Sequence, residues 1–486
     1  MIHGLPRLVA LSAACAGAAW ACASPPVAGT PARATDAEEA RAARNAPDAV
    51  RVLELTHNRK SGVVSAWLSN GVRLHYRRID QPPGQVQVAI AVLGSEMLET
   101  AETRARSALA AAAMDEWTLS APEAVRLGAE ARDVHIDAMA GPDALQLRVW
   151  GSAADMEIAL RAAAELLTRP HIDDAVLARA RAALGAEIAK RDGDSRAIAS
   201  GAMTGAIFPA NDPRVPPITL DNINRHTAAD VSAWLALHTQ IHGSPIEVAI
   251  VGDLTLAEAL RLAETGLGAI PARPRVSPGS LAAQRTVPHP PGPIVRVVDA
   301  GVTPEWSTVL VGAFGPDVRR TAEQRTLRAA ARVLGQRVAA RLTTDGIPVR
   351  PGSIGASLSL SAYTGMGLFF VSADTPASVP DAATRASAAI EDEIARLVTH
   401  PPTEAELAPV REALGKVVQT FDRDARYWAG LLARADSLGI NTDDVAEGVV
   451  FYSTLTPGQI SEGIKALWVP ANRVGITVSP RPAAQE

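Results

Sequence analysis

The sequence is poor in cysteine and aromatic residues, and its charges do not gather into blocks. Of 486 residues, two are cysteines, Cys15 and Cys22, and 4% are aromatic. Because both cysteines stand near the N-terminus, the remainder of the chain offers neither a disulfide framework nor a thiolate metal site. The 47 basic and 52 acidic residues give a net charge of −5 without a basic stripe, which argues against nucleic-acid binding.

Long apolar runs are also scarce. One run, residues 8–21, follows Arg7 and is too short to span a bilayer, so residues 1–23 are predicted to be an export signal. Ala21-Cys22-Ala23 fits signal-peptidase cleavage before Ser24, whereas residues 19–22 fit, less well, a bacterial lipobox that makes Cys22 an acylated first residue. We expect a periplasmic protein held to the bacterial outer membrane by lipid on Cys22, with ordinary cleavage as the alternative. Residues 24–49, rich in Ala, Pro and charge, are predicted to form a flexible tether.

An internal repeat dominates the rest of the chain. The strand pattern 86–93 leads into Gly94 and an Ala-rich helix, and the pattern 307–314 leads into Gly315 and a second Ala-rich helix. The two glycines are 221 residues apart, and the motifs that follow them, at Thr100 and Thr321, are separated by the same number of residues. Similar landmarks continue in the same order to a closing strand in each copy. Such self-similarity indicates one structural unit written twice.

The repeat, together with proline and turn signals, defines the expected domains. Seven prolines between residues 271 and 293 exclude a helix or central strand there and predict an extended linker over 270–293. Asn70-Gly71 between two strand patterns predicts a hairpin. We therefore predict an α+β fold with two homologous domains, 50–269 and 294–482. Each should have a mainly antiparallel sheet with helices packed on one face.

These patterns resemble a known family. The hairpin 68–74, the strand ending at Gly94-Ser95, the strand 248–252 before a helix, and the segment 468–473 before the last strand are similar to the pitrilysin/insulinase metallopeptidases, the inverzincins. The resemblance covers about residues 50–482. It implies two homologous domains, joined by a linker, that enclose peptides in a chamber.

Activity in that family depends on an H-x-x-E-H zinc motif in the first helix after the Gly-Ser strand. In this chain the three functional positions become Leu109, Ala112 and Ala113, and no histidine occurs between His75 and His135. Since alanine and leucine side chains cannot ligate zinc, we expect no catalytic residues, no bound metal and no cofactor in this chain.

Other family positions are also altered. Glu187 stands near the place of the family's third zinc ligand, and we interpret it as a solvated helix residue rather than a relic ligand. The family's second domain carries a substrate-holding Arg and Tyr; the Arg position corresponds here to Thr343 or Thr344, and no tyrosine follows before Tyr363. Arg341 and Arg350 are possible substitutes, although an ordinary surface charge is the simpler interpretation of each. The substrate-binding residues stay unknown.

Three functional hypotheses follow. The first is a non-catalytic homologue that pairs with an active, zinc-bearing relative to complete a peptide-degrading chamber, with unstructured peptides as further binding partners. The second is a stand-alone peptide-binding or scaffold protein. The third is a zinc metallopeptidase with an unrecognised site, for which His238 and His242 offer i, i+4 spacing on a helix face. No glutamate stands between these histidines, and Gly243 follows them, so we rank this hypothesis last.

Overall fold

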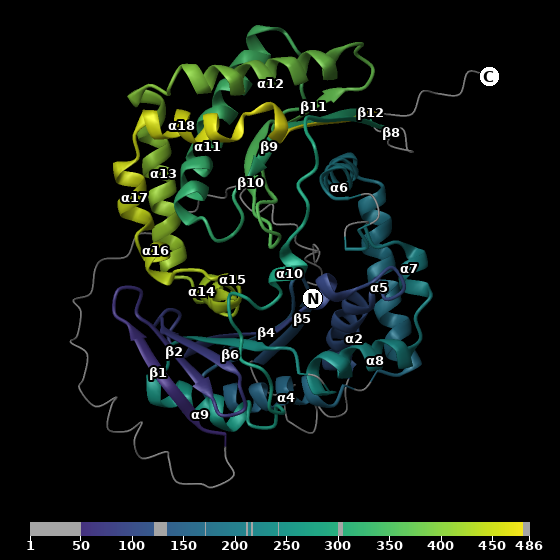
Figure 1. Cartoon of the computed structure of the whole chain (residues 1–486), viewed down its shortest axis with the longest axis vertical. Helices are drawn as coiled ribbons and strands as arrows, with labels where there is room; N and C mark the ends of the chain where they lie inside the picture. Colours follow the sequence, from purple (N-terminus) through teal and green to yellow (C-terminus); the bar gives the residue numbers. More distant parts are fainter. Residues whose placement is uncertain are drawn as a thin grey trace.

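The computed structural model describes residues 50–479 except 121–133, 171, 210–211, 215–216, 242 and 300–304. The predicted export signal, the tether and Cys22 lie outside the described residues. Two halves follow one another along the chain, each with its own sheet and helices (Figure 1). Among the described residues, no helix combines the length and apolar character needed to cross a membrane.

The first half contains a seven-stranded sheet in the order β1-β2-β3-β7-β4-β6-β5. Its helices pack on one face of this sheet and bury the largest apolar cluster of the described chain. The elements of this half are β1 (Val52–Asn58), β2 (Val63–Leu68), β3 (Arg73–Arg78), β4 (Gln85–Leu93), η1 (Ser95–Leu98), α2 (Arg106–Ser120), β5 (Val134–Ala140), β6 (Ala144–Ser152), α4 (Met156–Thr168), α5 (Asp174–Asp192), α6 (Ser195–Ile207), α7 (Leu220–Asn224), α8 (Ala228–Ala236), the π-helical turn η3 (Leu237–Ile241), β7 (Ile246–Gly252) and α9 (Leu256–Gly266).

The second half contains a five-stranded sheet in the order β10-β11-β9-β12-β8, with a second apolar cluster beneath its helices. The segment predicted as an extended linker contains the short helix α10 (Ala282–Arg285). The elements that follow are β8 (Ile294–Asp299), β9 (Trp306–Gly315), α11 (Thr321–Thr344), β10 (Gly355–Ser359), β11 (Gly367–Pro376), α12 (Ala382–Thr399), α13 (Glu404–Asp422), α14 (Ala425–Leu432), α15 (Ala435–Leu438), α16 (Thr442–Ala446), α17 (Gly448–Thr454), α18 (Pro457–Leu467), η4 (Pro470–Asn472) and β12 (Arg473–Ser479).

The predicted repeat is visible in the two sheets. Strands β3-β7-β4-β6-β5 of the first half have the same order as β8-β12-β9-β11-β10 of the second. Each set contains one parallel pair, β3 with β7 and β8 with β12, and its other pairs are antiparallel. The predicted α+β class with mainly antiparallel sheets is therefore confirmed, and β1 and β2 are an extension of the first copy.

The predicted hairpin joins β2 to β3 and requires a glycine at its turn. Gly71 has a φ of +85°, and a Cβ there would lie 2.1 Å from the carbonyl oxygen of Arg273. Asn70 completes the turn from the other side, since its side-chain amide donates to the carbonyl oxygens of Leu267 and Ile270. The Asn-Gly pair thus ties the hairpin to the start of the linker.

The two halves exchange one helix each, which the sequence did not predict. Helix α14 of the second half lies on the open face of the first sheet (Figure 1), where Trp428 packs among small residues such as Ala89 and Ala249. Helix α6 of the first half packs in turn on β8, β9 and β12. Both sheets are therefore covered on two faces, and the second cover comes from the other half.

Candidate functional site

The helix at the place of the family's zinc motif is α2, and a buried carboxylate fixes its N-terminus. Glu99 accepts hydrogen bonds from the backbone N–H groups of Ala105 at 3.1 Å and Ser107 at 2.7 Å. A negative charge on free N–H groups at the start of a helix is stabilising. The start of α2, and hence the register of the positions that follow, is set by this contact.

Two of the three motif positions, Ala112 and Ala113, lie in an apolar contact between α2 and α5, whereas Leu109 belongs to the main apolar cluster of the first half. Leu109 and Ala113 are fully buried, and Ala113 packs against Val176 and Ala180 of α5 with Ala112 at the edge of the cluster. The methyl and isobutyl side chains at these positions carry no lone pair for a metal. At this place the two helices are joined by hydrophobic packing.

Glu187 lies elsewhere on α5. It is half-buried and stands seven residues beyond Ala180, about 10 Å further along the helix axis. Val176 and Ala180, the α5 residues in the cluster around Ala113, precede Glu187 on the same helix.

The two candidate arginines have carboxylate partners within the protein. Arg341 pairs through Nε with Asp345 at 2.6 Å, on the turn that ends α11. Arg350 lies 2.6 Å from the buried carboxylate of Asp374, which also receives Arg196 of α6 at 2.9 Å. Arg350 and Arg196 therefore help to hold α6 on the second sheet. Both contacts agree with a structural role for these charges.

His238 lies in an apolar pocket of about 470 Å³ below the end of β4. Its ring packs on Trp234 with centroids 4.4 Å apart, and its Nδ1 lies 3.3 Å from the Ser244 hydroxyl. Burial lowers the pKa of His238 to about 4, so the imidazole is neutral at physiological pH. His242, the second histidine of the predicted pair, lies outside the described residues.

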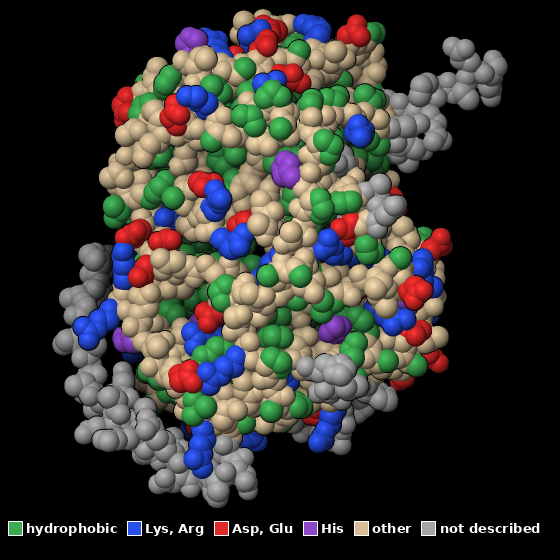
Figure 2. All heavy atoms as spheres, viewed as in Figure 1, with side chains coloured by type: hydrophobic (Ala, Val, Ile, Leu, Met, Phe, Trp, Pro, Cys, Tyr) green, Lys and Arg blue, Asp and Glu red, His purple; other side chains and the backbone are tan. Residues whose placement is uncertain are grey.

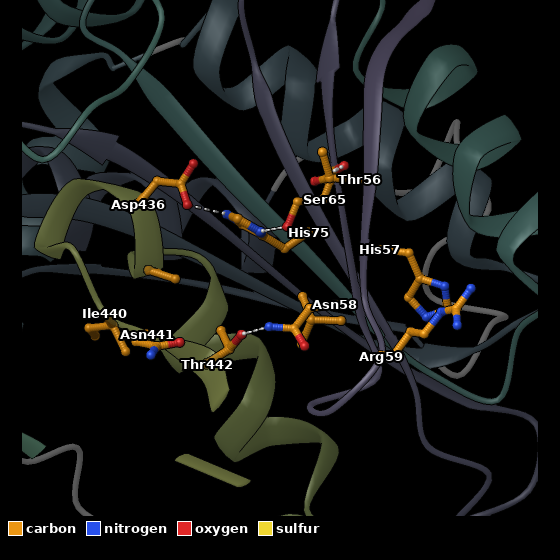
Figure 3. A pocket seen from close by; sticks show the side chains of 12 residues that line it. Thr56, His57, Asn58, Arg59, Ser65, His75, Asp436, Ile440, Asn441 and Thr442 are labelled. Atoms are coloured by element: carbon orange, nitrogen blue, oxygen red, sulfur yellow. Dashed lines mark hydrogen bonds and ion pairs between the residues drawn. The ribbon is translucent and has the colours of Figure 1, made fainter. Parts of the chain in front are cut away.

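A second pocket, of about 530 Å³, opens where the first sheet meets helices α15 and α16. Figure 3 shows its lining, with residues of β1 to β3 on one side and Asp436 to Thr442 on the other. The contact of Asn58 Nδ2 with Thr442 Oγ1, at 3.4 Å, connects the two sides. This joint pocket therefore belongs to both halves of the molecule.

His75 of β3 lies at the inner end of the joint pocket and is 2% exposed. Its Nδ1 is 2.8 Å from the hydroxyl of Ser65 on β2. Its Nε2 is 3.0 Å from Oε1 of Glu247 and 3.8 Å from Oδ1 of Asp436. One imidazole thus faces two carboxylates, one from each half of the chain.

Glu247 of β7 is fully buried and connects the two halves directly. Its carboxylate accepts hydrogen bonds from the backbone N–H groups of Asp436 at 2.6 Å and Ser437 at 3.1 Å. The other oxygen of the Asp436 side chain lies 2.6 Å from Nε of Arg73. Because a buried carboxylate without partners is costly, these contacts explain how β7 carries a glutamate among apolar residues.

Sequence reasoning missed the group formed by His75, Glu247 and Asp436. Its members lie on β3, β7 and α15, so no spacing along the chain connects them. The one available signal was Glu247 itself, a charged residue in the strand pattern Ile-Glu-Val-Ala-Ile-Val-Gly, every residue of which is buried. A charge in such a strand indicates a buried partner.

Comparison with known proteins agrees with the two-half fold described above. A family model described as the peptidase M16 inactive domain matches residues 236–414, from the end of α8 into α13. Among the curated proteins, no match is found. The described residues moreover have the two-half fold of solved M16-like structures.

The chain has an M16-like fold.

Three solved structures illustrate the similarity of this M16-like protein to its relatives. The peptidase M16 inactive domain from Pseudomonas fluorescens has 15% identity and a TM-score of 0.72, with 87% of this chain and 100% of that chain covered. A protease from Helicobacter pylori has 14% identity and a TM-score of 0.71, with 88% and 100% covered. The periplasmic protease PqqL from Escherichia coli has 17% identity and a TM-score of 0.70, with 90% and 48% covered.

These matches confirm the predicted resemblance to the pitrilysin/insulinase family. The matched protein chains also differ in length. The M16-like protein spans the whole of the two shorter chains and about half of PqqL. At these identities the structural likeness describes the fold, and activity must be argued from the residues of this chain.

Proposed function

We propose that this M16-like protein is a non-catalytic peptidase homologue that pairs with an active, zinc-bearing relative and completes its peptide chamber. One observation carries the proposal, namely the packing of Ala113 against Val176 and Ala180 at the zinc-motif position. The fold around that position is retained while the position itself offers no metal ligand.

The lengths of the relatives support pairing. PqqL is a protease in which this chain covers 48% of the length, so one PqqL chain has room for two bodies of this size. A protein with a single body can obtain the second from another chain. We expect an interface well above the roughly 1,000 Å² of total buried surface that a stable complex needs.

The expected location is compatible with such a partner. PqqL is described as periplasmic, and the sequence predicts export with a lipid on Cys22. An anchored non-catalytic subunit would hold a soluble protease at the inner surface of the outer membrane. Its ligands would be unstructured peptides that enter the shared chamber.

Co-expression with a zinc-bearing relative from the same genome tests the proposal. Size-exclusion chromatography with native mass spectrometry should give one-to-one co-elution, and cleavage of an unstructured peptide should be faster than with the relative alone. A relative whose zinc-ligating histidines are replaced by alanine is the control, since its complex should form but not cleave.

Separate elution with unchanged cleavage would contradict pairing. In that case peptide binding by the isolated chain would support the stand-alone binding or scaffold protein. Peptide cleavage by the isolated, highly purified chain would instead support a metallopeptidase with an unrecognised site.

A further inference from the structure

Three side chains with metal-binding atoms meet at the inner end of the joint pocket. His75, Glu247 and Asp436 each offer one ligand atom, and the three atoms lie within 4.8 Å of one another. His75 and Glu247 are 2% and 0% exposed, whereas the side chain of Asp436 is 31% exposed toward the pocket. Two members of the group are therefore buried, and the third, Asp436, lines the pocket, where Figure 3 shows its carboxylate directed toward the ring of His75.

The distances from His75 to the two carboxylates are close to the ligand spacings around a small divalent ion. Zinc lies about 2.0–2.1 Å from imidazole nitrogen and about 2.0–2.2 Å from carboxylate oxygen. Ligands at such distances are about 3.0 Å apart in octahedral geometry and about 3.4 Å apart in tetrahedral geometry. The observed separations from His75 Nε2 are 3.0 Å to Glu247 and 3.8 Å to Asp436. An ion would take the place of the direct contact between His75 Nε2 and Glu247 Oε1.

Surrounding groups hold the three ligands in place. Ser65 contacts Nδ1 of His75 and so directs Nε2 toward the carboxylates. Backbone N–H groups of Asp436 and Ser437 hold Glu247. Arg73 binds Oδ2 of Asp436 and leaves Oδ1 facing His75. Such outer contacts orient the ligands and are typical of built metal sites.

The donor set favours zinc over magnesium or calcium. The latter two ions prefer cages of oxygen ligands, whereas imidazole favours transition metals and zinc. The positive charge of Arg73 offsets the negative charge of one of the two carboxylates. This further disfavours magnesium and calcium, which are held mainly by negatively charged ligands. The pocket beside Asp436 leaves room for water or another ligand in a fourth position.

We propose that His75, Glu247 and Asp436 form a zinc-binding site at the joint between the two halves. This site is distinct from the family's motif position on α2. It departs from the sequence-based expectation of a metal-free chain, which rested on the missing zinc ligands at Leu109, Ala112 and Ala113. A zinc ion here binds β3 and β7 of one half to α15 of the other, and thus holds the two halves together.

Isothermal titration of the full chain with zinc chloride, after treatment with a chelator, tests the site. We expect one equivalent of zinc in the wild type and its loss in His75→Gln and Asp436→Asn. Ser65→Ala should weaken binding by about 10- to 100-fold, because the orienting contact on Nδ1 is removed. Cobalt(II) in place of zinc should give a visible absorption band with the same dependence on the variants.

Two histidine variants are matched controls. His57→Ala changes a residue that lines the same pocket outside the group, and His238→Ala changes the candidate from the sequence. Both should keep one equivalent. Zinc binding that is absent from the wild type, or that survives in Asp436→Asn, would overturn the proposal. If His75→Gln fails to fold, the Asp436→Asn variant decides the test, because the side chain of Asp436 is partly exposed. Partner co-elution is measured separately, so the two proposals can fail independently.

Discussion

Replacement of Trp428 by alanine should weaken the contact between the two halves. Trp428 lies on α14 of the second half, is 0% exposed, and is buried against the first sheet. A Trp-to-Ala change at a buried site costs about 3–5 kcal/mol of unfolding free energy through lost burial and the remaining cavity. The guanidinium of Arg77 lies 3.8 Å from the ring centroid, and loss of this contact adds about 0.5–1 kcal/mol. Together, the two losses should lower the unfolding free energy by an amount near the upper end of the range of about 3–5 kcal/mol.

Urea unfolding followed by circular dichroism measures the change. Gly430→Ala is a matched control on the exposed surface of the same helix, because a Cβ there meets no atom within 4 Å. That control should leave stability unchanged or raise it by up to about 1 kcal/mol. Hydrogen exchange should also become faster in β4 and β7, the strands that α14 covers. A loss below about 1 kcal/mol for Trp428→Ala would refute the exchange of helices as a source of stability.

Charge and packing elsewhere allow three further tests. Ala113→His forces a larger side chain into the α2–α5 contact and should lower the unfolding free energy by about 1–3 kcal/mol, measured in urea, without zinc binding at that position. The hydrogen bond from Arg337 lowers the pKa of Glu406 to about 2, so its stabilising contribution is complete above the ordinary pKa of 4.5 and is lost as pH falls toward 2. Glu406→Gln should therefore lower the thermal midpoint at pH 7, and the difference from wild type should vanish near pH 2. Cys22→Ser should move the exported protein from the membrane fraction to the soluble fraction, and equal solubility of both forms would contradict lipid anchoring.

Local patterns in the sequence were sufficient for most of the architecture. Alternating apolar residues and the Asn70-Gly71 turn predicted the hairpin of β2 and β3, since a turn is specified by the residues that form it. The repeated offset predicted two copies, and the structure shows the same strand order in both. The loss of zinc ligands at Leu109, Ala112 and Ala113 could also be recognised directly, because a side chain without a lone pair cannot ligate a metal in any fold.

The exchange of helices and the group at the joint were decided by tertiary structure alone. The apolar residues of α14 indicate that one face is buried, but not that the sheet beneath it lies more than 170 residues away in the chain, at β7. His75, Glu247 and Asp436 likewise come from three separate segments, and their chemistry depends on a meeting that no spacing encodes. Periodicity specifies which surface of an element is buried, whereas the partner of that surface follows from how all the elements pack together.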